Sequence, residues 1–368
     1  MKKVISVVGA RPNFMKVAPI HRAFEKYPNI EHFLVHTGQH YDKNMSDAFF
    51  QDLEMPHPKH FLSVGSGTHA QQTAKVMVEF ERILELEKPD LVIVVGDVNS
   101  TVACSLTAVK LHIPVAHVES GLRSGDRKMP EEINRLVTDS ICDIAFVTEE
   151  SGKRNLLKED YPEKNIHFVG NTMIDSQHFA LQKLAGNNVL ERLGLTSKGY
   201  VLSTVHRPSN VDNKEQMNDL LDIFELISKR RTVVIPMHPR TKKNIESFGL
   251  TEKLEAIENL VITEPLGYLD FLNLMKNCDF VMTDSGGIQE ETTALGVDCI
   301  TIRTTTERPS TIELGTNILV QPNKNDIEKA VNKYLSGDRK TGSVPYLWDG
   351  NAAERIAEVI SNRLSESK

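Results

Sequence analysis

Four carboxylates in the first half of the chain have the residue type and spacing that proton transfer requires. Asp97 and Glu119 each follow a short apolar run, and Glu131 and Glu132 follow Pro130. Carboxylates beside an anion site suit acid–base chemistry at a sugar carbon, with a nucleoside diphosphate as the leaving group. Glu131 and Glu132 could equally form the solvated first turn of a helix, and both interpretations stay open.

A second stretch, residues 280–296, could hold the diphosphate. Its sequence is FVMTDSGGIQEETTALG, which predicts a buried strand, a tight turn at Ser285–Gly287, and a helix over 288–295 with Glu290 and Glu291 in its first turn. A glycine pair lets backbone N–H groups approach an anion, and a helix N-terminus carries about half a positive charge. The stretch therefore indicates a diphosphate cradle next to a carboxylate for a sugar hydroxyl, and an ordinary glycine turn is the alternative.

Other nucleotide motifs are incomplete. The residues after the first predicted strand, Gly9 to Asn13, keep only the first glycine of G-x-G-x-x-G, and Gly65–Thr68 lacks the Lys-Ser/Thr of a P-loop. These departures argue against NAD and against ATP hydrolysis. Arg11 and Lys16 could still supply cations to a phosphate. The chain shows no H-x-x-E-H set or dense His/Cys/Asp cluster, so no metal and no cofactor are expected.

The elements that must position these residues alternate short apolar runs with helical patterns. Near-continuous Val/Ile runs indicate strands covered on both faces, which is typical of a parallel sheet. Strands are predicted at 4–8, 33–36, 91–95, 115–118, 144–147 and 166–169, and again at 200–205, 232–237, 260–262, 280–282, 299–302 and 318–320. Helices such as 15–26, 71–86 and 99–111 lie between them. The pattern predicts an α/β protein with two doubly wound, Rossmann-like domains.

A charged or titratable residue follows most of these strands. Ligands of open α/β sheets bind beyond the carboxyl ends of the strands. Those ends carry Arg11, Gln39–His40, Asp97, Glu119, His206–Arg207, His238 and Arg240, Asp284–Ser285, and Arg303. The repetition predicts that the two domains face a central cleft lined by cations and carboxylates.

The length of 368 residues exceeds the size at which one hydrophobic core usually stops growing. We expect an N-terminal domain over residues 1–171, a C-terminal domain over 172–350, and a last helix within 351–368 that could pack back on the first domain.

The composition indicates which kinds of partner and which cellular compartment to expect. A net charge of −7 argues mildly against nucleic-acid binding. No signal peptide or spanning segment is recognised, so no membrane contact is expected. The four cysteines stand singly, which favours buried free thiols in a reducing cytoplasm over disulfides or a metal site.

Six motifs resemble the non-hydrolysing UDP-N-acetylglucosamine 2-epimerases. They are GARPNFMK (9–16), GDVNST (96–101), HVESGLRSGD (117–126), PEEINR (130–135), TDSGGIQEE (283–291) and TTERP (305–309). The resemblance runs from the first strand to at least Pro309. It implies a GT-B-like fold in which the C-terminal domain holds most of the UDP and the N-terminal domain holds the sugar.

Site residues follow from this resemblance position by position. Asp97, Glu119 and Glu131 match the acid–base carboxylates, and His206 matches a histidine near the diphosphate. Phe271 matches the position that packs near the uracil, and Glu291 would hold ribose hydroxyls. The substrate-binding set that the resemblance implies is Arg11, Lys16, Arg135, Phe271, Ser285, Gly286, Gly287, Glu291 and Arg308.

The implied reaction is epimerisation of UDP-GlcNAc to UDP-ManNAc by elimination and re-addition of UDP, in a cytoplasmic homodimer that feeds surface-polysaccharide synthesis. A modified substrate such as UDP-2,3-diacetamido-glucuronate is the alternative, followed by a GT-B glycosyltransferase and a hydrolysing epimerase. Gln39–His40 matches part of a regulatory UDP-GlcNAc site of bacterial members, but the segment 41–72 departs from their pattern. Substrate activation is therefore left open.

Overall fold

The computed structural model describes residues 1–38 and 53–366, and for Arg11 it describes the backbone alone. The chain divides into two compact units. Unit 1 contains Met1–Phe179 and Tyr346–Lys368, and unit 2 contains Ala180–Pro345. Residues 172–179 and 346–350 thus belong to unit 1, whereas the sequence-based ranges had placed them in the second domain.

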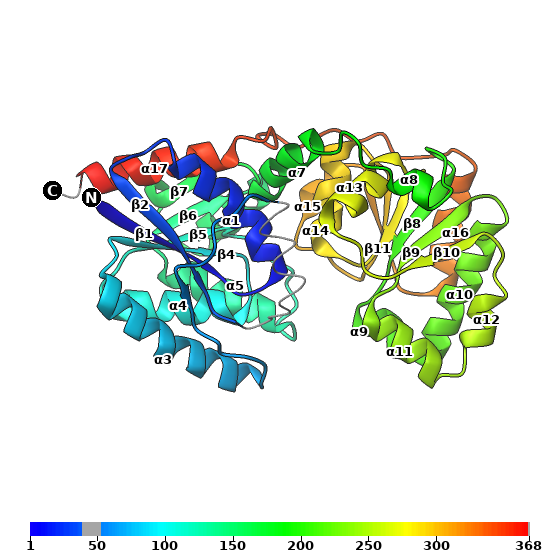
Figure 1. Ribbon diagram of the computed structural model, residues 1–368, viewed down its shortest axis with the longest axis horizontal. Coiled ribbons are helices and arrows are strands. Elements are labelled where there is room, and N and C mark those ends of the chain that lie inside the picture. Colours follow the sequence, from blue (N-terminus) through cyan, green and yellow to red (C-terminus); the bar gives the residue numbers. More distant parts are fainter. Residues whose placement is uncertain (39–52, 367–368) are drawn as a thin grey trace. The chain divides into compact units, whose positions relative to one another are not determined.

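Unit 1 is built on a parallel sheet whose described strands run in the order β3-β2-β1-β4-β5-β6-β7 (Figure 1). The chain winds from β1 in the middle to one edge, and then from β4 to the other edge, as in a Rossmann fold. The strands are β1 (Lys2–Val8), β2 (Ile30–His36), β3 (His60–Phe61), β4 (Leu91–Val95), β5 (Val115–Val118), β6 (Ile144–Val147) and β7 (Ile166–Phe168).

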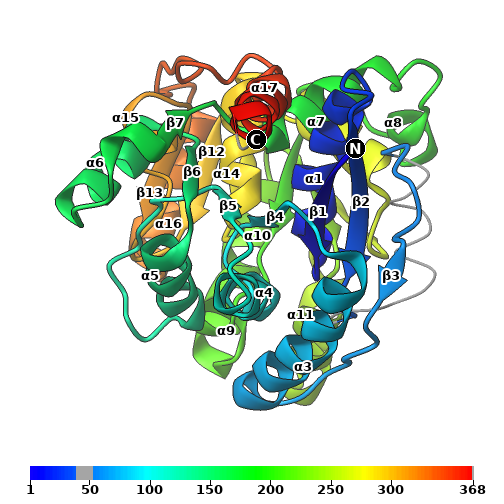
Figure 2. The same ribbon diagram turned by 90° about the vertical axis from the view of Figure 1, so that its left-hand side faces the viewer.

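Helices cover both faces of this sheet. The helices are α1 (Arg11–Phe24), α3 (His69–Glu87), α4 (Asn99–Lys110), α5 (Pro130–Ile141), α6 (Glu150–Lys158), the short 3₁₀ helix η1 (Glu163–Asn165), α7 (Thr172–Gln182) and α17 (Ala352–Glu366). Figure 2 shows α3, α4 and α5 on one face, and α1, α7 and α17 on the other. The carboxylate of Asp175 caps α17 by accepting bonds from the amides of Ala352 and Ala353. This capping joins the end of the chain to the core of unit 1.

Unit 2 repeats the scheme with the strand order β10-β9-β8-β11-β12-β13. Its strands are β8 (Tyr200–Thr204), β9 (Thr232–Pro236), β10 (Leu260–Thr263), β11 (Val281–Thr283), β12 (Cys299–Ile302) and β13 (Asn317–Val320). Its helices are α8 (Val189–Arg192), α9 (Pro208–Val211), α10 (Lys214–Ser228), α11 (Pro239–Ser247), α12 (Thr251–Glu255), α13 (Tyr268–Asn277), α14 (Gly286–Leu295), α15 (Pro309–Glu313) and α16 (Lys324–Leu335).

Burial along the strands explains why the sheets form. Every residue of β4, β5 and β6 is buried, so these strands are covered on both faces. In β8, Val201 packs into the core on one face, while Tyr200 and Leu202 pack into the core on the other. The predicted α/β class with two doubly wound parallel sheets is confirmed. None of the described helices is long and apolar enough to cross a membrane.

The buried His36 at the end of β2 should make unit 1 less stable in acid. Its ring stacks on Phe61 with centroids 4.6 Å apart, and its Nδ1 accepts a bond from the Gly38 amide. Burial lowers the pKa of His36 to about 4. The unfolded chain therefore binds a proton at this residue between about pH 6.5 and pH 4, where the folded chain does not.

Stability should accordingly fall as the pH drops through this window, by up to about 3 kcal/mol at pH 4 from His36 alone. The variant His36→Asn offers an oxygen near the Nδ1 position but cannot be protonated. We expect denaturation midpoints measured from pH 7 to pH 4 to fall less in His36→Asn than in the parent protein. Parallel pH profiles for the two proteins would contradict the assignment.

Candidate active site

In each sheet the strand order reverses at one point, and such a point is where a ligand site is expected. In unit 1 this point lies between β1 and β4, and in unit 2 between β8 and β11. Ligands of doubly wound folds bind at the carboxyl ends of the strands on either side of such a point. Gly9 and Asp97 follow the two strands of unit 1, and His206 and Ser285 follow those of unit 2.

A buried ion pair joins two predicted site residues in unit 1. Lys16 Nζ lies 2.5 Å from Glu119 Oε2, and the two side chains are only 7% and 3% exposed. Lys16 is one turn into α1, and Glu119 follows β5. A Cβ added to Gly96 would lie 2.9 Å from Lys16 Nζ. The turn after β4, the turn after β5 and the first turns of α1 therefore converge on one point.

Asn13 fixes the first of these elements. Its Oδ1 accepts bonds from the amides of Gly9 and Ala10, and its Nδ2 donates to the carbonyl of Val95. One side chain thus ties the end of β1 to the end of β4. In the sequence, this role is indicated by the position of Asn13 as the third residue of α1, where residues that cap a helix N-terminus are common.

Glu119 has a backbone conformation that few non-glycine residues adopt, with φ of 69°. Such left-handed residues persist only when the surrounding structure holds them, and they cluster at functional sites. Here the conformation sends the peptide chain out of β5 while the carboxylate meets Lys16.

Asp97 is held by Arg135 from α5. Both Nε and Nη2 of Arg135 donate to Asp97 Oδ2, at 3.0 and 2.6 Å, and Asp97 remains 26% exposed at its side chain. The other end of the guanidinium donates to Glu132 Oε2 at 2.7 Å. Arg135, predicted to bind substrate, is thus already occupied by two carboxylates in this structure.

The adjacent glutamates of α5 have different environments. Glu132 is buried and accepts bonds from the amides of Ser124 and Gly125 as well as from Arg135. Burial opposes ionisation of Glu132, but these bonds outweigh it and lower its pKa. Glu131 is partly exposed. Glu132 therefore holds the loop after Glu119, whereas Glu131, the predicted acid–base residue, keeps access to solvent.

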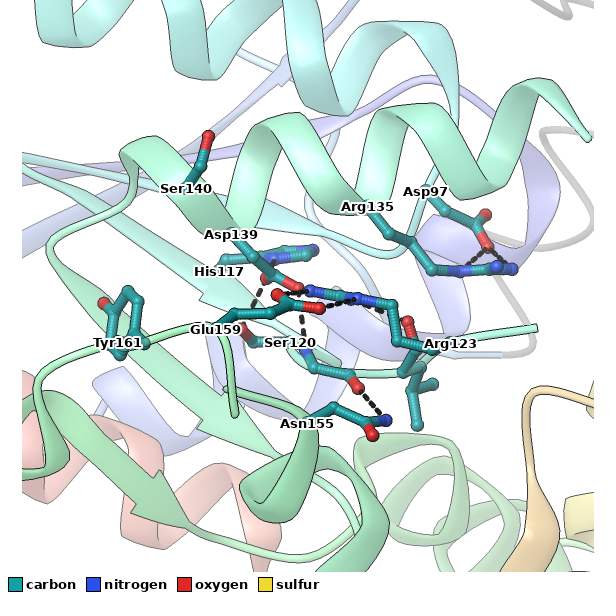
Figure 3. A network of polar contacts seen from close by, with 12 residues as sticks. Asp97, His117, Ser120, Arg123, Arg135, Asp139, Ser140, Asn155, Glu159 and Tyr161 are labelled. Atoms are coloured by element: carbon teal, nitrogen blue, oxygen red, sulfur yellow. Dashed lines mark hydrogen bonds and ion pairs between the residues drawn. The ribbon is translucent and has the colours of Figure 1, made fainter. Parts of the chain in front are cut away.

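A further carboxylate, Asp139 of α5, lies behind the turn after β5 (Figure 3). Its Oδ1 accepts bonds from His117 Nδ1 at 2.6 Å and from Ser120 Oγ at 2.5 Å. Its Oδ2 accepts a bond from the Gly121 amide at 2.9 Å and forms an ion pair with Arg123 Nη1 at 2.7 Å. Burial works to raise the pKa of Asp139, but these partners, His117 foremost, lower it to about 2. No sequence pattern singled out Asp139.

In unit 2 the predicted glycine turn opens α14. The helix begins at Gly286, two residues earlier than predicted, with Ser285 as its N-cap. Glu290 and Glu291 therefore lie beyond the first turn, and the prediction that they stand in it is wrong. The first turn has no acidic residue. Its first amides have no intrahelical partner and point toward any anion at this end.

Arg308 lies beside this turn. A Cβ on Gly286 would come within 3.0 Å of Arg308 Nη1. The guanidinium is 8% exposed, lies 2.9 Å from Glu290 Oε1 at its Nε, and donates from Nη1 to Glu307. Glu307 also pairs with Arg303. Two buried cations thus face two buried carboxylates behind the N-terminus of α14.

Asp284, the residue before the N-cap, holds the neighbouring turn. It is fully buried, and its Oδ2 accepts bonds from the amides of His206 and Arg207 and from Asn210 Nδ2. The His206 ring is 37% exposed and stacks on His238 with centroids 4.9 Å apart. The structure therefore places His206 next to the Ser285 turn.

The remaining predicted residues of unit 2 lie on α13 and α14. Tyr268 donates to Glu291 Oε1 at 2.6 Å, and Glu291 is buried. Phe271 is partly buried and packs against the core that includes Leu274 and Leu202.

The structure thus brings together Lys16, Asp97 and Glu119 in unit 1, and His206, the Ser285–Gly287 turn and Arg308 in unit 2. The side chain of Arg11 and the residues Gln39 and His40 lie outside the described part of the chain. Within the described residues no group of His, Cys, Asp and Glu could hold a metal ion. All four cysteines are buried. The chemical roles assigned to the site residues stay predictions.

The close packing at Gly286 gives a test of the Arg308 cluster. In Gly286→Ala the new methyl group would lie 2.9 Å from Glu307 Oε1, so the buried ion pairs must shift. We expect a loss of about 1–3 kcal/mol in the free energy of unfolding, measured by urea denaturation.

The control is Gly267→Ala, where no heavy atom lies within 4 Å of the added Cβ and φ is −62°. It should change stability by no more than about 0.5 kcal/mol. Equal midpoints for the two variants would contradict the packing described at Gly286.

Known proteins with similar sequences include 2-epimerases of UDP-sugars. The family model described as UDP-N-acetylglucosamine 2-epimerase matches residues 22–361. The UDP-N-acetylglucosamine 2-epimerase of Methanocaldococcus jannaschii is 46% identical over 365 residues, which cover 98% of this chain and 99% of that protein. The UDP-2,3-diacetamido-2,3-dideoxy-D-glucuronate 2-epimerase of Pseudomonas aeruginosa is 37% identical over 363 residues, which cover 98% of this chain and 99% of that protein.

A solved structure is also similar to this chain in both fold and sequence. The crystal structure of Methanocaldococcus jannaschii UDP-GlcNAc 2-epimerase in complex with UDP-GlcNAc and UDP has a TM-score of 0.88 and 44% sequence identity to this chain. The match covers 98% of this chain and 100% of that one. The motifs, the two doubly wound sheets and these matches over nearly the whole length show that the chain belongs to the UDP-N-acetylglucosamine 2-epimerase family.

Proposed function

We propose that this protein is an isomerase that interconverts UDP-GlcNAc and UDP-ManNAc. The observation that carries the proposal is the pair of carboxylates Asp97 and Glu119 on the turns after the neighbouring strands β4 and β5, each beside a buried cation. Relatives named UDP-N-acetylglucosamine 2-epimerase, at 46% and 41% identity, support this substrate.

The substrate dictates the kind of reaction. The hydrogen at C2 of UDP-GlcNAc is not next to a carbonyl group, so enolisation cannot invert this carbon. Removal of the C2 proton with departure of UDP from C1 gives 2-acetamidoglucal and UDP. Re-addition of UDP at C1, with protonation of C2 on the opposite face, gives UDP-ManNAc. Each step needs a proton acceptor or donor at C2 and a stabilised diphosphate at C1.

Unit 2 supplies the diphosphate site. The N-terminal turn of α14, from Ser285 to Gly287, presents backbone amides and a partial positive charge. Arg308 and His206 lie next to that turn and would balance the charge that develops on departing UDP. Glu291 would hold the ribose hydroxyls and Phe271 would pack near the uracil.

Unit 1 supplies the proton-transfer groups. Asp97, Glu119 and Glu131 are the candidate acids and bases at C2, while Lys16 and Arg135 balance the charge of Glu119 and Asp97. Arg11 and Lys16 would also contact phosphate or sugar. The reaction as written draws on protein side chains alone.

Three further features belong to this proposal. The modified sugar of the Pseudomonas aeruginosa relative is not favoured, because relatives with higher identity carry the UDP-GlcNAc name. We propose that two copies of the chain associate as a homodimer, which light scattering would detect. We also propose that the enzyme works in the cytoplasm, where it would supply ManNAc units for polysaccharide synthesis.

The mechanism is tested by incubating the protein with UDP-GlcNAc in D₂O and following the proton NMR spectrum. Because C2 is deprotonated and then protonated from a solvent-exchanged group, we expect UDP-ManNAc with deuterium at C2 and no need for an acceptor. Product that keeps its original C2 hydrogen would contradict the elimination mechanism. Free ManNAc with stoichiometric UDP would indicate a hydrolase, and turnover of the diacetamido-uronate alone would indicate the modified sugar.

The role of Asp97 is tested by Asp97→Asn. The amide keeps the size of the side chain but cannot accept a proton from C2, so we expect turnover to fall by about 10²–10⁴-fold with UDP affinity unchanged. Turnover is measured by NMR and UDP binding by calorimetry.

A matched control is Asp349→Asn, which also removes a carboxylate paired with an arginine of unit 1, Arg355. Its turnover should equal that of the parent protein. Unchanged turnover in Asp97→Asn would remove Asp97 from the catalytic residues.

A further inference from the structure

His117, the third residue of β5, connects the two turns that carry the candidate acid–base residues. Its ring is fully buried. Nε2 lies 2.8 Å from the carbonyl oxygen of Gly96, and Nδ1 lies 2.6 Å from Asp139 Oδ1. Gly96 directly precedes Asp97, and His117 lies two residues before Glu119. One ring therefore spans the turn after β4 and the start of the turn after β5.

The donor pattern assigns a proton to both ring nitrogens. A carbonyl oxygen can only accept, so Nε2 must donate to Gly96. The carboxylate of Asp139 accepts bonds from Ser120 and Gly121 and pairs with the Arg123 guanidinium, which together favour its ionised form. Nδ1 must then donate as well. The geometry therefore points to an N–H on each side of the His117 ring, one facing Gly96 and one facing Asp139.

The same carboxylate holds the backbone on both sides of Glu119. His117 lies before Glu119 and Ser120 lies after it, and both bond Asp139 (Figure 3). The amide of Gly121, the next residue, bonds the same carboxylate. Bonds to Asp139 of α5 therefore hold the backbone on both sides of Glu119, which itself has a left-handed conformation. Substitution at Gly121 is also blocked, because an added Cβ would lie 2.3 Å from the Gly152 carbonyl.

We propose that His117 and Asp139 are positioning residues for the epimerisation, which fix the turn of Asp97 and the turn of Glu119 relative to one another. Neither residue exchanges a proton with the sugar in this role. The pair acts by keeping two carboxylates in a geometry from which each reaches C2. Misplacement of a reacting group by about 1 Å can cost about 100-fold in rate. The inference rests on the proposed function.

Two variants separate the two bonds of the ring. In His117→Asn the side-chain amide lies near the Nδ1 position, so it keeps the bond to Asp139 and loses the bond to Gly96. In His117→Gln the amide lies near the Nε2 position, so it keeps the bond to Gly96 and loses the bond to Asp139. We expect kcat to fall about 10- to 100-fold in each variant, while KM for UDP-GlcNAc and the Kd of UDP stay within about threefold.

A purely structural role would change the amount of folded protein instead. The kcat is therefore expressed per UDP-binding site, counted by calorimetry with UDP. The control is His167→Asn, a strand histidine of β7 that makes none of these bonds, and its kcat should match the parent value. If both His117 variants keep the parent kcat per UDP-binding site, the proposal is wrong.

Two measurements test the proposal even if the His117 variants fail to fold. Ser120→Ala removes one of the three hydrogen bonds to Asp139 and should lower kcat about 3- to 10-fold at unchanged KM. An unchanged kcat would count against the positioning role. In the parent protein labelled with ¹⁵N-histidine, one buried ring should show two protonated nitrogens at pH 7. A set of spectra in which every buried ring keeps one unprotonated nitrogen would overturn the assignment of the His117–Asp139 ion pair.

Failure of the proposed function gives a different result. If the parent protein does not epimerise UDP-GlcNAc, the substrate is wrong, whatever the state of the His117 ring. If the parent protein epimerises the substrate and the His117 variants do so equally well, only the positioning role is lost.

Discussion

The turns that carry the candidate site residues depend on buried carboxylates that each accept several donors. Asp139 fixes the turn after β5 through three hydrogen bonds and an ion pair, and Asp284 fixes the turn after β8 through the amides of His206 and Arg207 and the side chain of Asn210. An ionised carboxylate buried without partners would cost several kcal/mol, so slippage of either turn is strongly opposed. Fully satisfied polar networks of this kind specify one arrangement of the backbone.

The two units differ in how their buried charges are arranged. In unit 2, Arg303 and Arg308 face Glu290 and Glu307, so the buried side chains sum to no net charge. The attraction that we propose for a diphosphate would then come from the N-terminus of α14, whose first turn has no acidic residue. In unit 1, Lys16 and Arg135 face Glu119, Asp97 and Glu132, so cations and carboxylates are interleaved where a neutral sugar carbon would exchange protons.

The sequence was sufficient for the α/β fold and for the strand ends at which the candidate site residues lie. Strands such as β4 and β6 are short runs of apolar residues, a local signal, and polar residues follow them. The supporting residues gave no such signal. Asp139 lies 18 residues from Gly121 along the chain, and Asp284 lies 78 from His206, so their bonds exist only after folding. The early start of α14 was missed because glycine is a poor helix former and the turn pattern at Ser285–Gly287 masked the first helical residues.

Fold alone does not separate an epimerase from a transferase that binds the same nucleotide, because function lies in the residues placed on the fold. The site of unit 2 would serve either enzyme, since both must hold UDP. Unit 1 is where the two diverge. A transferase needs one base for its acceptor, whereas an epimerase must remove and return a proton at one carbon while UDP is detached. Two carboxylates on turns that one buried ring ties together, with Glu119 held in a left-handed conformation, are the groups that we propose for that second requirement.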